Sequence, residues 1–153
     1  FSEWQIRNIH QLILKNIDDD NAGRYRQQNV LISGATSTPP DYTLLNDKMA
    51  QLVDWYSNDA HKFHPIERAA KVHADFVGIH PFIDGNGRTS RLLMNLELLK
   101  AGYPPCVITV ENRLAYYEAL DQWMAYGKTE AFIQLVSEAV LEGFKPYQVV
   151  LGI

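Results

Sequence analysis

The chain is poor in cysteine, lacks a long apolar run and carries no excess of positive charge. Its single cysteine, Cys106, excludes an internal disulfide and suits a reducing compartment, so we expect a cytoplasmic protein. No apolar segment approaches the ~20 residues that a membrane-spanning helix needs, and no signal peptide is recognisable. We therefore expect no association with a membrane.

The low net charge limits the ligands that the chain can attract. A formal charge of −4 gives no general attraction to nucleic acid or to an anionic membrane surface. We therefore expect no nucleic-acid partner, and an anionic ligand must be held by a local cluster of donors.

Length and composition are those of one folded domain. The 153 residues are 46% apolar and 21% charged, and a chain of this size buries a sizeable core. No internal repeat, low-complexity tract or linker divides it, so residues 1–153 should form a single domain. The first residue is Phe1 rather than methionine. We therefore expect a piece of a longer protein, without an upstream regulatory segment.

Apolar residues recur at helical spacing along most of the chain. A pattern resembling a capping box at Ser2–Gln5 opens the first helix, which should end in the polar run 18–21. Pro65 suits the first turn of another helix. The stretch from Arg88 to Gly102 is apolar on nearly all sides, which is typical of a buried central helix. Further helices are expected near residues 41–55, 112–126 and 129–144. The prediction is a mainly α fold.

Residues 24–34 form the one convincing strand-like stretch. The apolar run Val30, Leu31 and Ile32 ends at Ser-Gly, and two prolines follow at 39–40. The pattern predicts a short β-hairpin. From the residues alone this segment could equally be a strand of the core, and that alternative stays open.

Residues 80–91, HPFIDGNGRTSR, contain the densest group of reactive side chains. His80 in its neutral form can accept a hydroxyl proton near pH 7. Asp84 is a hard oxygen ligand, and Mg²⁺ commonly takes one or two protein carboxylates together with phosphate oxygens. Phe82 should anchor the loop in the core.

The second half of this motif suits an anion. If a helix begins near Arg88, the loop before it delivers its residues to a helix N-terminus, where free N–H groups and the dipole favour negative charge. Gly85 and Gly87 permit a positive φ and a close backbone approach, and Asn86 adds a side-chain donor. Arg88 and Arg91 share one side of the first turn and suit a polyphosphate. Together with the base and the metal ligand, these groups favour phosphoryl or nucleotidyl transfer.

The same residues resemble the Fic-family motif, H-x-F-x-(D/E)-G-N-G-R-x-x-R, and fill each of its fixed positions. NAGRYRQQNVLI is similar to the family's flap, and LLMNLELLKAGYPP and AYYEAL are similar to the helices after the active loop. The likeness covers essentially the whole chain and is greatest to the branch with the animal endoplasmic-reticulum Fic enzyme and many bacterial relatives. It implies the Fic fold, a helical bundle around a central buried helix with a small β-hairpin flap.

The resemblance implies transfer of AMP from ATP to a Ser, Thr or Tyr hydroxyl of a target protein, with release of pyrophosphate. His80 would be the base that deprotonates the hydroxyl. Asp84 would hold Mg²⁺, with Mn²⁺ as an alternative, against the α and β phosphates.

The remaining motif residues would bind the triphosphate. By the resemblance, Gly85, Asn86 and Gly87 cradle the phosphates, while Arg88 and Arg91 meet the β/γ end.

Two further parts of the site follow from the likeness. The segment Val30, Leu31 and Ile32 would be a flap that pins the target by strand addition. Tyr117 matches an aromatic residue beside the adenine. Close relatives carry an adenine-contacting Asn seven residues later, where this chain has Met124, so its adenine contacts should differ.

Many family members carry an inhibitory helix, (S/T)-x-x-x-E-(G/N), whose glutamate engages the second motif arginine. The nearest match here, Ser137 to Gly143, has one residue too many between the serine and the glutamate. A helix outside the chain or an antitoxin-like partner could supply the glutamate, and a homodimer is compatible with the sequence. Because Arg91 has no evident internal restraint, we expect the chain to act on ATP without relief of inhibition.

Several alternatives remain at this stage. The same base and metal ligand could activate water and remove AMP, and phosphocholine transfer could use the same scaffold. Gly87 argues against γ-phosphate transfer, because family members with that activity carry a lysine there. A non-catalytic nucleotide-binding interaction module needs neither His80 nor Asp84.

Other polar clusters have simpler explanations. His61, His64 and His73 could suggest a metal site, but no cysteine or acidic cluster accompanies them, and a core role is favoured for His73. The run Asp18 to Asp20 lacks the alternating ligands and the glycine of an EF-hand, so a solvated helix end is expected.

Overall fold

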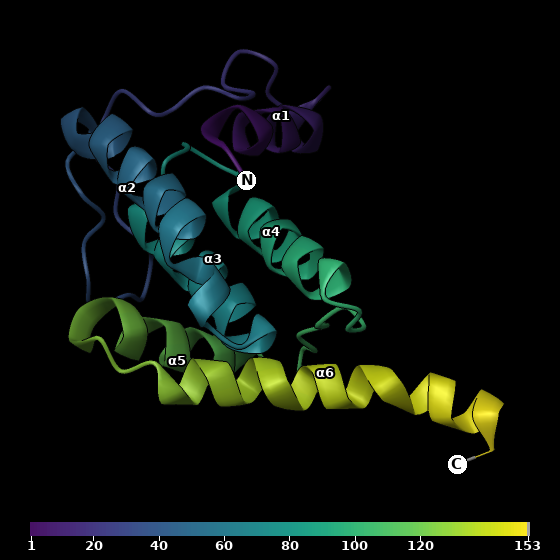
Figure 1. The fold of residues 1–153 in the computed structure, drawn as a ribbon. Coiled ribbons are helices and arrows are strands. Elements are labelled where there is room, and N and C mark those ends of the chain that lie inside the picture. The colour runs from purple at the N-terminus through teal and green to yellow at the C-terminus, as the bar shows by residue number, and fades with distance from the viewer. Residues whose placement is uncertain (153) are drawn as a thin grey trace.

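The computed structural model describes residues 1–152, and these residues form α-helices and short 3-10 helices without a β-strand (Figure 1). The α-helices are α1 (Glu3–Leu14), α2 (Leu45–Asn58), α3 (Pro65–Ile79), α4 (Asn86–Lys100), α5 (Arg113–Tyr126) and α6 (Glu130–Leu151), with 3-10 turns at Tyr42–Leu44 and Ala60–Lys62. The predicted mainly α bundle is confirmed. No helix formed by residues 1–152 combines the length and apolar character needed to cross a bilayer.

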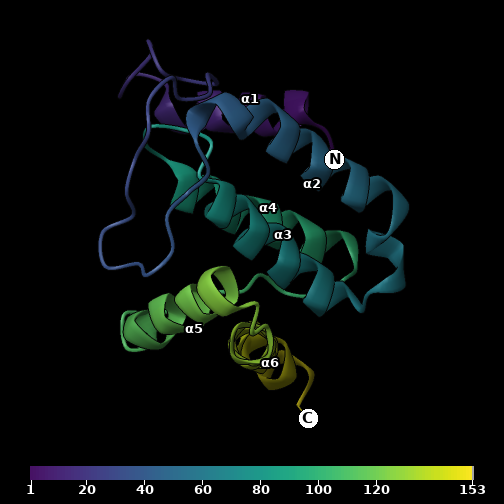
Figure 2. The same cartoon turned by 90° about the vertical axis from the view of Figure 1, so that its left-hand side faces the viewer.

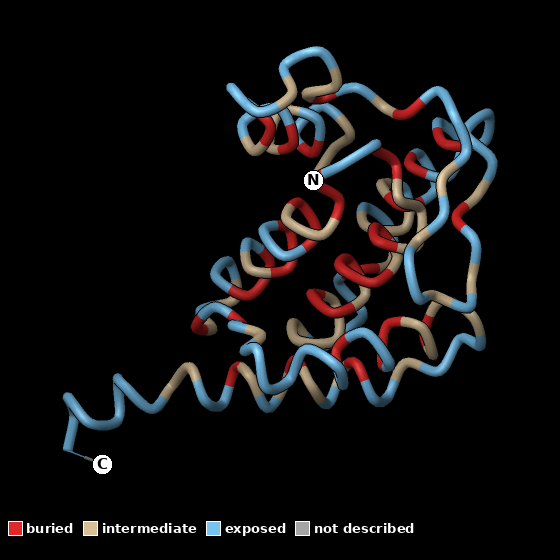
Figure 3. The backbone as a smooth tube through the Cα atoms, turned by 180° about the vertical axis from the view of Figure 1, so that it is seen from behind, coloured by how far each residue is buried: buried red, intermediate tan, exposed pale blue. Residues whose placement is uncertain are grey.

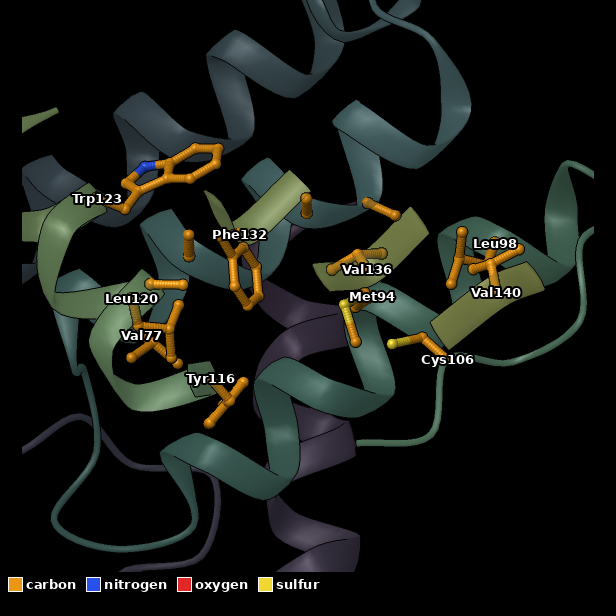
Figure 4. Close-up of a cluster of buried hydrophobic side chains, with 14 residues drawn as sticks. Val77, Met94, Leu98, Cys106, Tyr116, Leu120, Trp123, Phe132, Val136 and Val140 are labelled. Carbon is orange, nitrogen blue, oxygen red and sulfur yellow. The ribbon is translucent and has the colours of Figure 1, made fainter. Parts of the chain in front are cut away.

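The helices are arranged in three layers (Figure 2). α3 and α4 pack against each other in the middle, with α1 and α2 on one side and α5 and α6 on the other. One apolar core joins α3 and α4 to α5 and α6, and contains Met94, Leu98 and Phe132 (Figure 4). A second core joins the middle layer to α1 and α2, and contains Phe76 and Phe82. The two cores bury the ends of α3 and α4 between which the motif lies.

Local caps explain where two helices begin. The Ser2 side chain accepts a hydrogen bond from the Gln5 backbone N–H at the start of α1. At the start of α3, His64 and Glu67 form a reciprocal capping box, followed by Pro65 at the first helical position. His64 is therefore used as a helix cap.

The end of α1 differs from the expectation. The helix stops at Leu14 rather than in the run 18–21, because Asn16 adopts a left-handed φ of 64°. The acidic run then forms its own turn, in which Asp19 accepts from the Asn16 backbone N–H and Asp18 accepts from Asn21.

The predicted β-hairpin over residues 24–34 is wrong. A strand needs a ladder of backbone hydrogen bonds, and here the Arg26 N–H donates to the Pro81 carbonyl while the Ala35 N–H closes a turn on Ile32. Val30, Leu31 and Ile32 lie in an extended loop, so the alternative of a core strand is also wrong. The high β-propensity of this run had no neighbouring strand to pair with.

The expected central helix is α4, but it shares the centre of the bundle with α3. Its outer face exposes Leu92, Leu96 and Leu99. On its inner face Glu97 is buried and paired with the Tyr56 hydroxyl, Arg68 and Lys100. Figure 3 shows the same division along each helix, with buried residues facing the neighbouring layer and the last turns of α6 exposed.

Two adjacent leucines of α4 test this orientation. Leu98 is 0% exposed and Leu99 is 55% exposed. We expect Leu98→Ala to lower the free energy of unfolding by about 2–5 kcal/mol, and Leu99→Ala to change it by less than about 1 kcal/mol. Urea denaturation of both variants checks this, and equal losses would contradict the packing of α4.

Candidate active site

The first part of the motif, residues 80–85, forms a short loop between the two central helices. His80 ends α3, and Asn86 is the first residue of α4. Phe82 is fully buried in the core. The Asn86 side chain, 2% exposed, accepts from the Phe82 N–H at 3.0 Å and donates to the Phe82 carbonyl at 2.8 Å. These two bonds close the loop upon itself.

His80 is held at its backbone and at one ring nitrogen. Its φ of 51° and ψ of 58° are left-handed, a conformation that a helix end usually gives to Gly or Asn. Its Nδ1 lies 3.3 Å from the Val77 carbonyl. Because a carbonyl only accepts, this contact places the proton on Nδ1 and leaves the lone pair on Nε2.

The environment of His80 favours the neutral imidazole. Burial lowers the pKa of His80 below its ordinary value, the hydrogen bond to Val77 opposes this shift, and the charge of Arg26 adds to it. A neutral imidazole with a free Nε2 is the form that can accept a proton.

The N-terminus of α4 offers unpaired backbone donors. Gly85 precedes the helix with a φ of 78°, and the first helical bond runs from Thr89 N–H to the Gly85 carbonyl. Within residues 1–152 the N–H groups of Asn86, Gly87 and Arg88 have no partner. Such groups favour an anion.

Two expectations about this turn need correction. Gly87 lies in the first helical turn without a positive φ, so only Gly85 needs glycine for its backbone conformation. The Asn86 side chain is buried against Phe82, so it holds the loop and is not a side-chain donor for a ligand. Its backbone N–H remains available.

The two motif arginines have separate positions. Arg88 pairs with Asp84 (Nη2–Oδ2, 2.9 Å); the Arg88 side chain is 41% exposed and the Asp84 side chain 64%. The other Asp84 oxygen, Oδ1, accepts from the Gly85 N–H at 2.6 Å. Arg91 instead lies against Gly87, and its charge is close to Tyr116. The spacing of the two arginines predicted that they would project to the same side. In the structure they instead lie in separate positions.

A cavity of about 400 Å³ brings together side chains from the motif, the flap and α5. Its wall includes His80, Gly87 and Arg91 from the motif, and Tyr117 and Met124 from α5. Leu31 and Ile32 close it on the flap side, whereas Val30 does not line it. Asp84, Gly85, Asn86 and Arg88 also lie outside its wall.

Side chains that sequence reasoning missed fix the flap. Arg26, 3% exposed, donates from Nε to the His80 carbonyl at 2.8 Å and from its other nitrogens to the Gln28 and Pro40 carbonyls. Asp121 of α5 accepts from the N–H and hydroxyl of Thr36, each at 2.6 Å. No local pattern marks either residue, because their partners lie 54 and 85 positions away.

The histidines His61, His64 and His73, considered above as metal ligands, do not form a common site. His73 is fully buried, with Nε2 3.1 Å from the Tyr116 hydroxyl, and His64 caps α3. Among residues 1–152, no three His, Cys, Asp or Glu side chains are grouped so that they could hold a metal ion.

Comparisons with known proteins agree with this geometry. The sequence pattern of the Fic/DOC family matches residues 1–98. A protein adenylyltransferase Fic from Nematostella vectensis is 44% identical over 133 residues, which are 86% of this chain and 30% of that protein. The chain belongs to the Fic/DOC family. Protein adenylyltransferase fic-1 from Caenorhabditis briggsae is 41% identical over 116 residues, 75% of this chain and 22% of that protein.

Solved structures share the whole arrangement of this Fic domain. Fic-1 from C. elegans matches 99% of the chain with a TM-score of 0.88 and 34% identity, over 44% of its own length. A Fic domain containing signaling protein from Bacteroides thetaiotaomicron matches 94% with a TM-score of 0.84 and 30% identity, over 60% of its length. The chain thus spans less than a third of the two curated relatives described above.

The Asp121 contact predicts how firmly the flap is held. Asp121→Ala removes both acceptors of Thr36. We expect amide hydrogen exchange at Thr36 to accelerate, because its N–H loses this hydrogen bond. Glu118→Ala, at an exposed carboxylate of the same helix, is the matched control and should leave this rate unchanged. Unaltered exchange in Asp121→Ala would show that the flap is held elsewhere.

Proposed function

We propose that this Fic domain transfers AMP from ATP to a hydroxyl side chain of a target protein and releases pyrophosphate. The observation that carries this proposal is one cavity lined by both His80 and Arg91, next to the unpaired N–H groups at the start of α4. A proton acceptor and an anion site are thereby adjacent. The names of the relatives, protein adenylyltransferases, support the same reaction.

In this reaction the target hydroxyl oxygen bonds to the α-phosphorus of ATP while the bond from that phosphorus to the bridging oxygen breaks. The electron pair leaves with pyrophosphate. His80 Nε2 takes the hydroxyl proton, because Nδ1 is engaged with Val77. The left-handed backbone at His80, fixed by Arg26, holds the ring in the cavity wall.

The triphosphate would be held chiefly by backbone groups and Arg91. The N–H groups of Asn86, Gly87 and Arg88 can donate to phosphate oxygens, as helix N-termini do in other phosphate sites. Arg91 can fork onto the same anion from the cavity wall. Arg88 would join them once its pairing with Asp84 is exchanged for phosphate.

Asp84 is the residue that would hold Mg²⁺ or Mn²⁺. Its side chain is 64% exposed and is the single carboxylate of residues 80–91, which fits a cation that keeps waters and takes phosphate oxygens. When bound, the ion would neutralise phosphate charge during transfer.

The flap would bind the target through its backbone. Within residues 1–152 the N–H groups of Val30, Leu31 and Ile32 have no backbone partner, and the Leu31 side chain is 81% exposed. An extended target segment can pair with such groups. Tyr117 and Met124 line the α5 side of the cavity and would contact the base of the nucleotide.

His80→Ala tests the proposed chemistry. General-base catalysis contributes about 10²–10⁴-fold, so we expect AMP transfer to fall by at least about 100-fold while ATP affinity stays within about threefold. Labelled ATP with Mg²⁺ and a cell lysate, followed by mass spectrometry, measures the transfer and identifies the added group. Added phosphate or phosphocholine in place of AMP would instead indicate another group transfer.

The absence of an ion pair at Arg91 within residues 1–152 leads to a prediction about regulation. Arg91 forms no ion pair with any residue from 1 to 152. We therefore expect this chain to transfer AMP without removal of an inhibitor. ATP binding without turnover in the wild type, with His80→Ala indistinguishable from it, would refute the enzymatic proposal and favour a nucleotide-binding module.

The pKa of His80 predicts the acid side of the pH profile. Because burial lowers this pKa below 6.5, the neutral base should persist below pH 6.5. We expect kcat/KM for ATP to fall on acidification with a midpoint below 6.5, and NMR titration of His80 in the free protein to give the same midpoint. A midpoint above 6.5 in both measurements would contradict the burial of this ring.

A further inference from the structure

His10 of α1 lies against the loop of residues 80–85 between α3 and α4, here called the active loop, although it precedes His80 by 70 positions. The side chain is fully buried. Its ring stacks on Phe82, with centroids 3.5 Å apart and planes 2° from parallel. Its Nε2 lies 2.8 Å from the Asp84 carbonyl oxygen. One side chain thus contacts the core anchor and the metal-ligand residue of the loop.

The hydrogen bonds of His10 define its tautomer. The Gly23 N–H donates to Nδ1 at 2.9 Å, so Nδ1 carries the lone pair. Nε2 therefore carries the proton and donates it to the Asp84 carbonyl. In the neutral form both ring nitrogens of His10 therefore have a hydrogen-bond partner. The ring links the backbone of Gly23, just before the flap segment, to the backbone of Asp84 in the active loop.

The carbonyl that His10 holds belongs to the same peptide unit as the Gly85 N–H. In a planar trans peptide these two groups point in opposite directions. The Gly85 N–H donates to Asp84 Oδ1 at 2.6 Å. A rotation of this peptide unit would therefore break the bond to His10 and displace the Asp84 carboxylate together.

Space around Gly85 shows how close the contact is. A Cβ at Gly85 would lie 3.2 Å from His10 Nε2 and 3.3 Å from Cδ2. The φ of 78° at this residue already favours glycine. The loop is therefore fitted to the imidazole as well as to its own backbone conformation.

We propose that His10 is a positioning residue of the active loop: by donating to the Asp84 carbonyl it orients the Asp84 carboxylate for a divalent cation bound with the nucleotide. The inference rests on the proposed function, since it concerns how the same site binds metal and ATP. His10 touches neither the nucleotide nor the cation. It acts through the Asp84–Gly85 peptide.

Two variants separate the two hydrogen bonds of the ring. His10→Gln keeps a donor at the position of Nε2 and loses the acceptor for Gly23. His10→Asn keeps an acceptor at the position of Nδ1 and loses the donor to Asp84. Both variants lose the stacking on Phe82, so a general weakening of the core affects them alike. Leu12→Asn, at a 72% exposed position of α1, controls for placing asparagine in this helix.

The measurement is calorimetric binding of ATP with Mg²⁺ and of ATP with EDTA. Loss of an outer partner of a metal ligand typically costs 10–100-fold in metal affinity. We expect His10→Asn to weaken Mg²⁺-dependent ATP binding at least about tenfold, and His10→Gln to weaken it less than about threefold. Binding in EDTA should change little in either variant, and Leu12→Asn should match the wild type throughout.

The outcomes distinguish this inference from the proposed function. Equal loss in both His10 variants, or loss in neither, would overturn the positioning role while leaving AMP transfer intact. Failure of the wild type to bind ATP would overturn the proposed function itself. Nitrogen NMR of wild-type His10 provides a second test that needs no variant: protonation at Nε2 is expected, and protonation at Nδ1 would refute the inference.

Discussion

Two hydrogen bonds between the Asn86 side chain and the Phe82 backbone hold the loop on which the rest of the site depends. They satisfy a buried N–H and a buried carbonyl, and leaving either group unpaired would cost about 1–3 kcal/mol. Because Phe82 is itself fixed in the core, this pair sets the distance between the end of α3 and the start of α4. His80 at one end and Gly87 at the other thereby line one cavity.

The charged residues of the motif fall into two groups: an ion pair at Arg88 and Asp84, and Arg91 in the cavity wall. Arg88 pairs with Asp84, so those two charges largely cancel. Arg91 has no such partner among residues 1–152 and lies in the cavity wall, where its charge acts together with the N-terminus of α4. A chain with a net charge of −4 thus presents a local positive site beside His80. Burial meanwhile lowers the pKa of His80, so the positive potential does not depend on a protonated imidazole there.

Sequence reasoning predicted the features that are encoded locally. Helical spacing and caps predicted the six helices, and three motif residues, His80, Gly87 and Arg91, line the cavity. It failed where a distant partner decides the structure. The side chain of Asn86 was expected to face a ligand and instead faces Phe82. The anchoring roles of Arg26 and His10 depend on carbonyls 54 and 74 positions away, which no pattern in a single sequence reveals.

The failure of the predicted hairpin bears on how a target would be bound. A hairpin pairs the backbone groups of its two strands with each other. Here the segment around Leu31 is instead held at its two ends, by the bond from Arg26 to the Gln28 carbonyl before it and by the Thr36–Asp121 contact after it. Side chains supply the anchoring, and within residues 1–152 the N–H groups of Val30, Leu31 and Ile32 have no backbone partner. The run of β-prone residues is therefore retained in an extended form whose missing strand partner another chain can supply.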